Sequence, residues 1–103
     1  MTVVTFALPQ ESGNFRQAIR EAGGRLGGEE IRIAHLGVGP EAAGSSIRRL
    51  LAAEIPRVLI CAGFAGGLDA RVRTGDLVVA DNFSAPGLRA RAWQACSQNP
   101  PRT

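Results

Sequence analysis

The stretch CAGFAGGLD, Cys61–Asp69, places three glycines and two alanines directly after the apolar run RVLI. An apolar run of this kind predicts a buried strand. Glycine permits tight turns, and backbone amides that no side chain covers can approach an anionic or sugar ligand. The stretch therefore predicts either a plain turn or a ligand-binding loop at the end of a strand.

Strand-like and helix-like segments alternate around this stretch. Runs of β-branched and aromatic residues predict strands, whereas apolar residues spaced by three and four predict helices. The predicted elements are strands at 2–8, 31–39, 57–63 and 76–83 and helices at 12–24 and 40–54. This order indicates βαβ units, and hence an α/β fold with a mostly parallel sheet covered by helices.

The alternating pattern weakens after Phe83. Residues 84–103 contain three arginines and no acidic residue, and they predict only a short helix at 88–96. A length of 103 residues suits one modest domain. We therefore expect a domain over residues 1–83 and a weakly ordered basic tail over residues 84–103.

Charge and composition argue against several classes of protein. The net charge of +3 comes from the tail, because nine arginines and nine acidic residues cancel through Asp81. The chain has no Lys and no Tyr, so the basic surface with stacking aromatics of a nucleic-acid-binding protein is not expected. No apolar run approaches the roughly 20 residues that span a bilayer, and the first residues lack the features of a secretory signal. We expect a cytoplasmic protein with no nucleic-acid or membrane partner.

The two cysteines and the histidine do not predict a metal site. Cys61 falls in a predicted strand and Cys96 in the tail, a spacing that fits neither a disulfide framework nor a metal cluster. His35 is in phase with Ile31 and Ile33 along a predicted strand, which favours a core or interface histidine over a ligand.

A second glycine motif, GVGPEA at Gly37–Ala42, formally fits the G-x-G-x-x-G/A fingerprint of dinucleotide-binding proteins. Its context is weak, because it follows the second predicted strand and no acidic residue closes the next strand. The alternative is a tight turn from strand to helix, with Pro40 in the first turn of the helix. Dinucleotide binding therefore stays open as a minor alternative.

Four motifs occur in a specific order along residues 3–81. They are ALPQE at Ala7–Glu11, GVGPEAA at Gly37–Ala43, AGFAGGLD at Ala62–Asp69 and GDLVV at Gly75–Val79. In this order the chain resembles the N-terminal part of the purine nucleoside phosphorylase and nucleosidase superfamily, closest to the methylthioadenosine/S-adenosylhomocysteine nucleosidase branch. The resemblance implies an α/β/α sandwich and cleavage of the N-glycosidic bond of a purine-type nucleoside by water or phosphate. It implies no cofactor, with phosphate as a potential co-substrate.

The resemblance also implies roles for individual residues. Glu11 falls on the catalytic glutamate that positions the attacking water and the ribose in the nucleosidase branch. A carboxylate there can orient or deprotonate water, although it can also simply stabilise the start of the first helix. The implied substrate-binding residues are Val38, Gly63, Phe64, Ala65, Gly66 and Gly67.

The sequence departs from the family pattern in three ways. Phe64 stands where many members have a serine, and the connector at 24–30 is too short for the extra strand of the nucleosidases. The later methionine-glutamate segment and the serine-aspartate pair that supplies the general acid are not found in the 103 residues. We therefore expect an incomplete catalytic domain, inactive alone, that needs a complementing C-terminal chain or a homo-oligomer. The alternative is a non-catalytic α/β module that binds a nucleoside-like ligand or dimerises.

Overall fold

A computed structural model of the chain describes residues 1–80 and 82–95. The chain forms two compact units, Met1–Ala65 and Gly66–Thr103. The first unit contains the sheet and most of the helical structure, and the second contains a single described helix.

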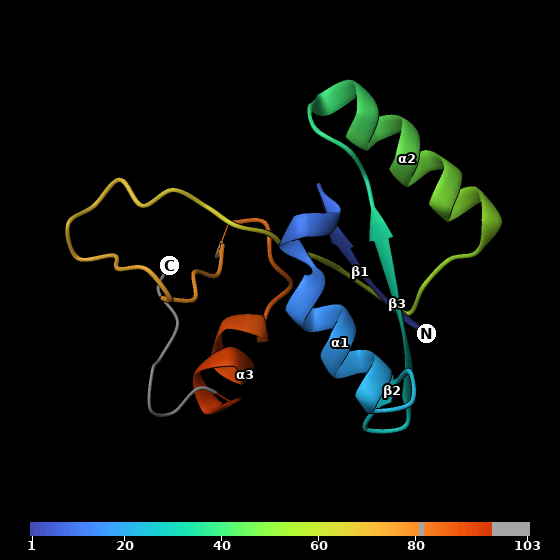
Figure 1. Cartoon of the computed structure of the whole chain (residues 1–103), viewed down its shortest axis with the longest axis horizontal. Helices are drawn as coiled ribbons and strands as arrows, with labels where there is room; N and C mark the ends of the chain where they lie inside the picture. Colours follow the sequence, from blue (N-terminus) through green and yellow to red (C-terminus); the bar gives the residue numbers. More distant parts are fainter. Residues whose placement is uncertain (81, 96–103) are drawn as a thin grey trace. The chain divides into compact units, whose positions relative to one another are not determined.

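The first unit is built on a four-stranded sheet in the order β2-β3-β1-β4. The strands are β1 (Thr2–Phe6), β2 (Arg25–Leu26), β3 (Glu29–His35) and β4 (Val58–Cys61). β1 pairs in parallel with β3 on one side and with β4 on the other, while β2 pairs antiparallel with β3. Figure 1 shows β1 and β3 side by side.

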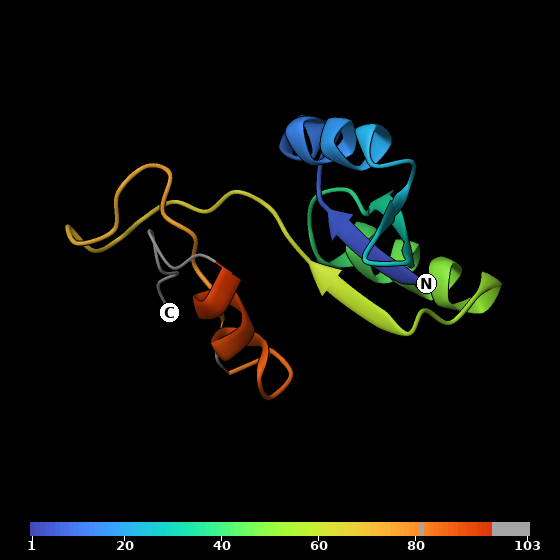
Figure 2. The ribbon, with the colours of Figure 1, turned by 90° about the horizontal axis from the view of Figure 1, so that it is seen from below.

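Helices cover both faces of this sheet. The chain passes from β1 to β3 through η1 (Pro9–Glu11) and α1 (Gly13–Glu21), and from β3 to β4 through α2 (Pro40–Ala53). These two crossovers run in opposite directions along the sheet, so right-handed connections place α1 and α2 on opposite faces. Figure 2 shows the two helices on either side of the strands. The arrangement confirms the predicted α/β fold with a mostly parallel sheet.

The core is centred on β1, all five residues of which are buried. Val3, Val4 and Phe6 supply most of the buried apolar side chains, and Ile19 adds one from α1. A middle strand with helices on both faces has no solvent-facing side, which explains why its sequence TVVTF does not alternate with charged residues.

α1 packs on the sheet through the face that the spacing predicted. Ile19 is buried, and the ring centroids of Phe15 and Phe6 lie 5.9 Å apart. Ser12 occupies the N-cap position of α1, but its side chain makes no capping hydrogen bond. Ser12 has φ −104° and ψ 0°, following directly from η1, whereas a capping residue usually has extended backbone.

The hairpin formed by β2 and β3 was not predicted. The connector was interpreted as too short for a strand, and this is wrong, because Arg25–Leu26 pairs with Glu29 and Glu30. The two residues between the strands, Gly27 and Gly28, both have positive φ, at 56° and 81°. Such a turn lets the chain reverse within two residues, so a strand fits in a very short connector.

Charged groups gather where the strands begin. Glu29, the first residue of β3, lies 2.9 Å from the amino group of Met1 and 3.1 Å from Arg57, which precedes β4. The hydrogen bond from the Met1 amino group is the main reason why the pKa of Glu29 falls from 4.5 to about 2, and a hydrogen bond from Arg57 adds to it. These contacts join the starts of β1, β3 and β4.

The predicted fourth strand at 76–83 is wrong for the described residues of that segment. They form only an isolated β-bridge at Val78. A sequence rich in valine favours extended backbone, but a strand exists only where a neighbouring edge pairs with it along several residues. The helix predicted at 88–96 is present as α3 (Leu88–Ala95), and Cys96 lies outside the described residues.

Within residues 1–80 and 82–95, no helix has the length and apolar character needed to cross a membrane.

Candidate active site

Three parallel strands end at the same edge of the sheet, and backbone hydrogen bonds extend their pairing beyond the strand ends. The Leu36 amide donates to the Phe6 carbonyl and the Gly37 amide to the Ala7 carbonyl. On the other side of β1, the Ala62 amide donates to the Thr5 carbonyl. The segments after β1, β3 and β4 therefore lie next to one another, and η1 begins at this edge.

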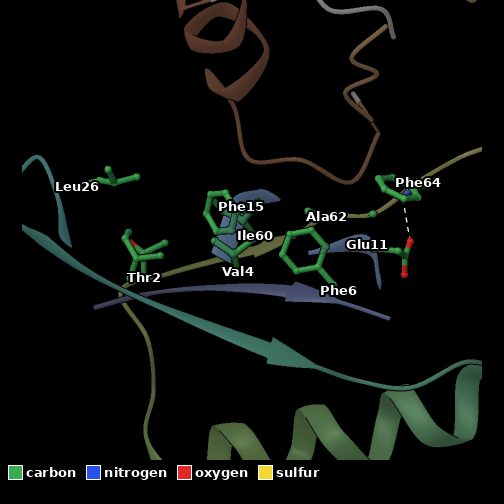
Figure 3. Close-up of a pocket in the computed structure, with 11 residues that line it drawn as sticks. Thr2, Val4, Phe6, Glu11, Phe15, Leu26, Ile60, Ala62 and Phe64 are labelled. Carbon is green, nitrogen blue, oxygen red and sulfur yellow. Dashed lines mark hydrogen bonds between the residues drawn. The ribbon is translucent and has the colours of Figure 1, made fainter. Parts of the chain in front are cut away.

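Glu11, the last residue of η1, holds two backbone amides with its carboxylate. One oxygen, Oε1, accepts a hydrogen bond of 3.0 Å from the Leu8 N–H. The other, Oε2, accepts a hydrogen bond of 2.9 Å from the Phe64 N–H, which Figure 3 shows as a dashed line. The carboxylate thus joins η1 to the glycine-rich segment that follows β4.

Gly63 leaves room for this contact. A Cβ at position 63 would lie 2.8 Å from Oε2 of Glu11, which is closer than real Cβ contacts allow. A side chain there would force the end of the Glu11 side chain to move. The space left by the missing side chain, and not a positive φ, explains the glycine.

An apolar cavity of about 440 Å³ lies beside Glu11. Most of its lining comes from the face of the sheet that α1 covers, with Val4 and Phe6 from β1, Ile60 from β4 and Phe15 from α1. Figure 3 shows these side chains on one side of the strands and α2 on the other. Glu11, Gly63 and Phe64 also line the cavity, and among its described lining residues the one carboxylate, that of Glu11, lies next to Phe64.

The chain matches the family model of the phosphorylase superfamily over residues 8–101. It belongs to the phosphorylase superfamily. This membership confirms the resemblance to nucleoside phosphorylases and nucleosidases that the four ordered motifs indicated. No solved structure matches the chain at a significant level.

In this phosphorylase-superfamily chain, three of the predicted site residues come together. Glu11, Gly63 and Phe64 contact or adjoin one another and line the cavity. Val38 does not line it, although it follows β3 at the same edge, and its side chain is 71% exposed. Ala65, which ends the first unit, does not line it either.

Gly66 and Gly67 belong to the second unit of this phosphorylase-superfamily chain. A Cβ at Gly67 would lie 3.3 Å from the side chain of Val72, whereas a Cβ at Gly66 would have nothing within 4 Å. Local packing therefore explains the glycine at 67, and the proposed contact of both residues with a substrate stays a prediction.

The sequence did not reveal a polar pair next to the site. The Ser12 hydroxyl, which is 0% exposed, lies 2.7 Å from Nε2 of His35 and donates to the Pro9 carbonyl at 3.1 Å. His35 was predicted as a core or interface residue, and the core assignment is wrong because His35 is exposed at the end of β3. Ser12 and His35 are 23 residues apart, and no spacing rule links such residues across two strand ends.

The turn GVGPEA has a structural explanation in this phosphorylase-superfamily chain. Gly37 and Gly39 have φ of 83° and 93°, which residues with side chains rarely adopt, and Gly39 immediately precedes α2. Pro40 occupies the first position of α2 and has no N–H to offer to a phosphate. The geometry favours a tight strand-to-helix turn over a dinucleotide site.

Among residues 1–80 and 82–95, no three His, Cys, Asp or Glu side chains lie close enough together to hold a metal ion.

Proposed function

We propose that this protein binds a purine-type nucleoside and acts on its N-glycosidic bond, with water or phosphate as the nucleophile. One observation carries the proposal, namely the Glu11 carboxylate that two backbone amides hold at an apolar cavity. Membership of the phosphorylase superfamily supports it. A cytoplasmic location and the absence of a bound cofactor are part of the same proposal.

The geometry of Glu11 suits a group that orients a nucleophile. A carboxylate oxygen can accept two hydrogen bonds, and each oxygen of Glu11 accepts one from a backbone amide. One acceptor site on each oxygen is then available for a ribose hydroxyl or a water. A carboxylate in this position can orient or deprotonate water beside an oxocarbenium-like carbon.

The cavity suits the apolar faces of a nucleoside. Its volume of about 440 Å³ falls within the range of about 300–1,000 Å³ that is typical of small-molecule sites. Phe6 and Phe15 offer aromatic surface on its wall, and Phe64, which is 78% exposed, can turn onto a bound ring. The substitution of Phe64 for the serine common in the family favours an apolar contact in place of a hydroxyl.

The departing purine needs a proton, and we propose that its donor lies outside the 103 residues. The family's serine-aspartate pair has no match in the sequence. A complementing C-terminal chain or a second copy of this chain would then bring the general acid to the site. General acids commonly contribute about 10²–10⁴-fold to rate, so the chain by itself is expected to turn over slowly.

The first test is to incubate the protein with inosine, adenosine and methylthioadenosine, with and without phosphate, and to quantify the released base. The variant is Glu11→Gln, and the control is Glu41→Gln, which changes an exposed glutamate in the first turn of α2. We expect Glu11→Gln to lower cleavage by about 100-fold and the control to leave it unchanged. Neither binding nor cleavage of any nucleoside by the wild-type protein would refute the proposal.

A non-catalytic nucleoside-binding module is the second candidate. It is favoured by the role of Glu11 within η1, where the carboxylate also accepts a hydrogen bond from the Leu8 amide at the start of the same turn. A carboxylate can make that contact in a purely structural site. Calorimetric binding of a nucleoside without release of base, also after addition of a complementing chain, would select this candidate.

A further inference from the structure

Two consecutive side chains tie the end of η1 to both neighbours of β1. Glu11 accepts a hydrogen bond from the Phe64 amide, in the segment after β4. Ser12 contacts His35, the last residue of β3. Because β3 and β4 flank β1 in the sheet, η1 is held from both sides across the ends of three parallel strands.

The Ser12 hydroxyl lies 2.7 Å from Nε2 of His35 and 3.1 Å from the Pro9 carbonyl. When the hydroxyl donates to Pro9, its oxygen can accept a hydrogen bond from Nε2–H, so the direction of the His35 contact follows from the tautomer of the ring.

Burial of Ser12 limits the partners that its hydroxyl can have. Ser12 is 0% exposed, so loss of His35 leaves the buried hydroxyl with the Pro9 carbonyl and no water to replace the imidazole. The usual reason for a serine before a helix is capping of the first amides, and the Ser12 side chain makes no capping bond to α1. The bonds that the Ser12 hydroxyl does make are to Pro9 in η1 and to His35.

We propose that Ser12 and His35 are positioning residues that hold η1 so that the Glu11 carboxylate stays on the Phe64 amide. Neither residue lines the cavity, so both act through Glu11. This role rests on the proposed function of Glu11 for its effect on catalysis. Its structural part, the coupling of His35 to the Phe64 amide, can be measured without any substrate.

The test measures amide hydrogen exchange of Phe64 by NMR in the full chain. The variants are Ser12→Ala and His35→Leu, and His35→Gln is the conservative variant because its side-chain amide can still donate to Ser12. Thr5→Val is the matched control, since it removes a buried hydroxyl that bonds to Ile60 in the sheet and not to η1. His35 is exposed, so its variants avoid cavities in the core.

We expect Phe64 exchange to accelerate about tenfold in Ser12→Ala and His35→Leu, as in Glu11→Gln, and to stay near the wild-type rate in His35→Gln and Thr5→Val. Unchanged exchange in Ser12→Ala and His35→Leu would overturn the proposal. So would an equal acceleration in Thr5→Val, because it would show a general loss of stability.

A second readout separates this proposal from the proposed function. If the protein cleaves nucleosides, Ser12→Ala and His35→Leu should lower kcat about tenfold or more with little change in KM, and His35→Gln should restore kcat. If the wild-type protein cleaves nothing, the proposed function fails, and the exchange rates alone decide the positioning role. A fall in kcat that His35→Gln does not restore would count against it.

Discussion

The Glu11 carboxylate occupies the space that a side chain at position 63 would need. The carboxylate bonds to the Phe64 amide beside position 63, where an added Cβ would lie 2.8 Å from Oε2. The motif order predicted both residues, but it assigned Gly63 to backbone approach of a ligand. The structure gives it a different first role, which is to make room for the side chain of Glu11.

Gly63→Ala should break this contact. We expect a loss of about 0.5–1 kcal/mol in unfolding free energy, because the contact is exposed and the end of the Glu11 side chain can move away from a new Cβ, together with weaker nucleoside cleavage. Urea denaturation and the base-release assay measure the two effects. Gly66→Ala is the control, because a Cβ at position 66 would meet nothing within 4 Å. Equal destabilisation by both substitutions would contradict the explanation.

The sequence predicted Glu11, Gly63 and Phe64 as site residues but not the contacts that hold them. Family motifs identify residue types at positions, and they led directly to these three. The Ser12–His35 pair had no such signal, because its partners come from different elements and His35 also fits the strand pattern. The Phe6 and Phe15 walls of the cavity were detectable as apolar faces, but the same faces also form ordinary cores.

At the scale of elements, the β2–β3 turn needs glycine because both of its residues have positive φ. Gly28 has φ 81°, where a side chain costs energy, while Gly13, at the start of α1, has no such constraint. We expect Gly28→Ala to destabilise the protein by about 1–2 kcal/mol and Gly13→Ala to stabilise it by about 0.5–1 kcal/mol. Thermal unfolding measures both, and the same sign for both variants would refute the turn geometry.

The ion pairs of Glu29 at the starts of the strands predict that the stability of the protein depends on pH. The pKa of Glu29 is lowered to about 2 by the Met1 amino group and Arg57, against 4.5 as its ordinary value. Because the pKa of Glu29 is lowered in the folded protein, the stabilisation that its ionised carboxylate gives to the fold is fully present above about pH 4.5. This stabilisation is lost as the pH falls toward 2.

We therefore expect the wild-type protein to lose unfolding free energy between pH 4.5 and 2, and Glu29→Gln to show a shallower loss. Urea denaturation at several pH values in this window measures the difference. Glu30→Gln serves as the control, because Glu30 contacts Arg32 and not the amino terminus. An equally shallow profile in that control would contradict the assignment to Glu29.

Elements with a long apolar pattern were predicted, and those without one were missed. α2 begins and ends within one residue of its predicted bounds, since Pro40 and the apolar spacing define it locally. β2 has only two residues, too few for any alternation, and it exists because a glycine turn returns it to β3. The run at 76–83 has strand composition, yet a strand also needs a partner, which composition cannot supply.

At the scale of the whole molecule, the family match and the compact units have different boundaries. The match covers residues 8–101, whereas the first unit ends at Ala65. Large apolar side chains are exposed in both units, including Ile55 and Phe64 in the first and Leu68 and Phe83 in the second. Exposed apolar surface of this kind favours association with another copy or another chain.

We expect the protein to self-associate at micromolar concentrations. Sedimentation velocity should give a mass above the 10.8 kDa of one chain, increasing with concentration. Leu68→Ser and Phe83→Ser together should shift the distribution toward the monomer, while Arg48→Ser, which changes an exposed polar position of α2, should not. A monomer at every concentration tested would count against a homo-oligomer.

The opposite directions of the two crossovers have a consequence for where chemistry can evolve in this fold. The chain changes direction beside β1, because the connection from β1 to β3 crosses one face of the strands and the connection from β3 to β4 crosses the other. Backbone topology brings the ends of β1, β3 and β4 together, so under the proposed function Phe64 and its neighbours can change ligand preference without moving the site. Selection can therefore alter what is recognised by substitution alone, while the place of recognition stays fixed by the path of the chain.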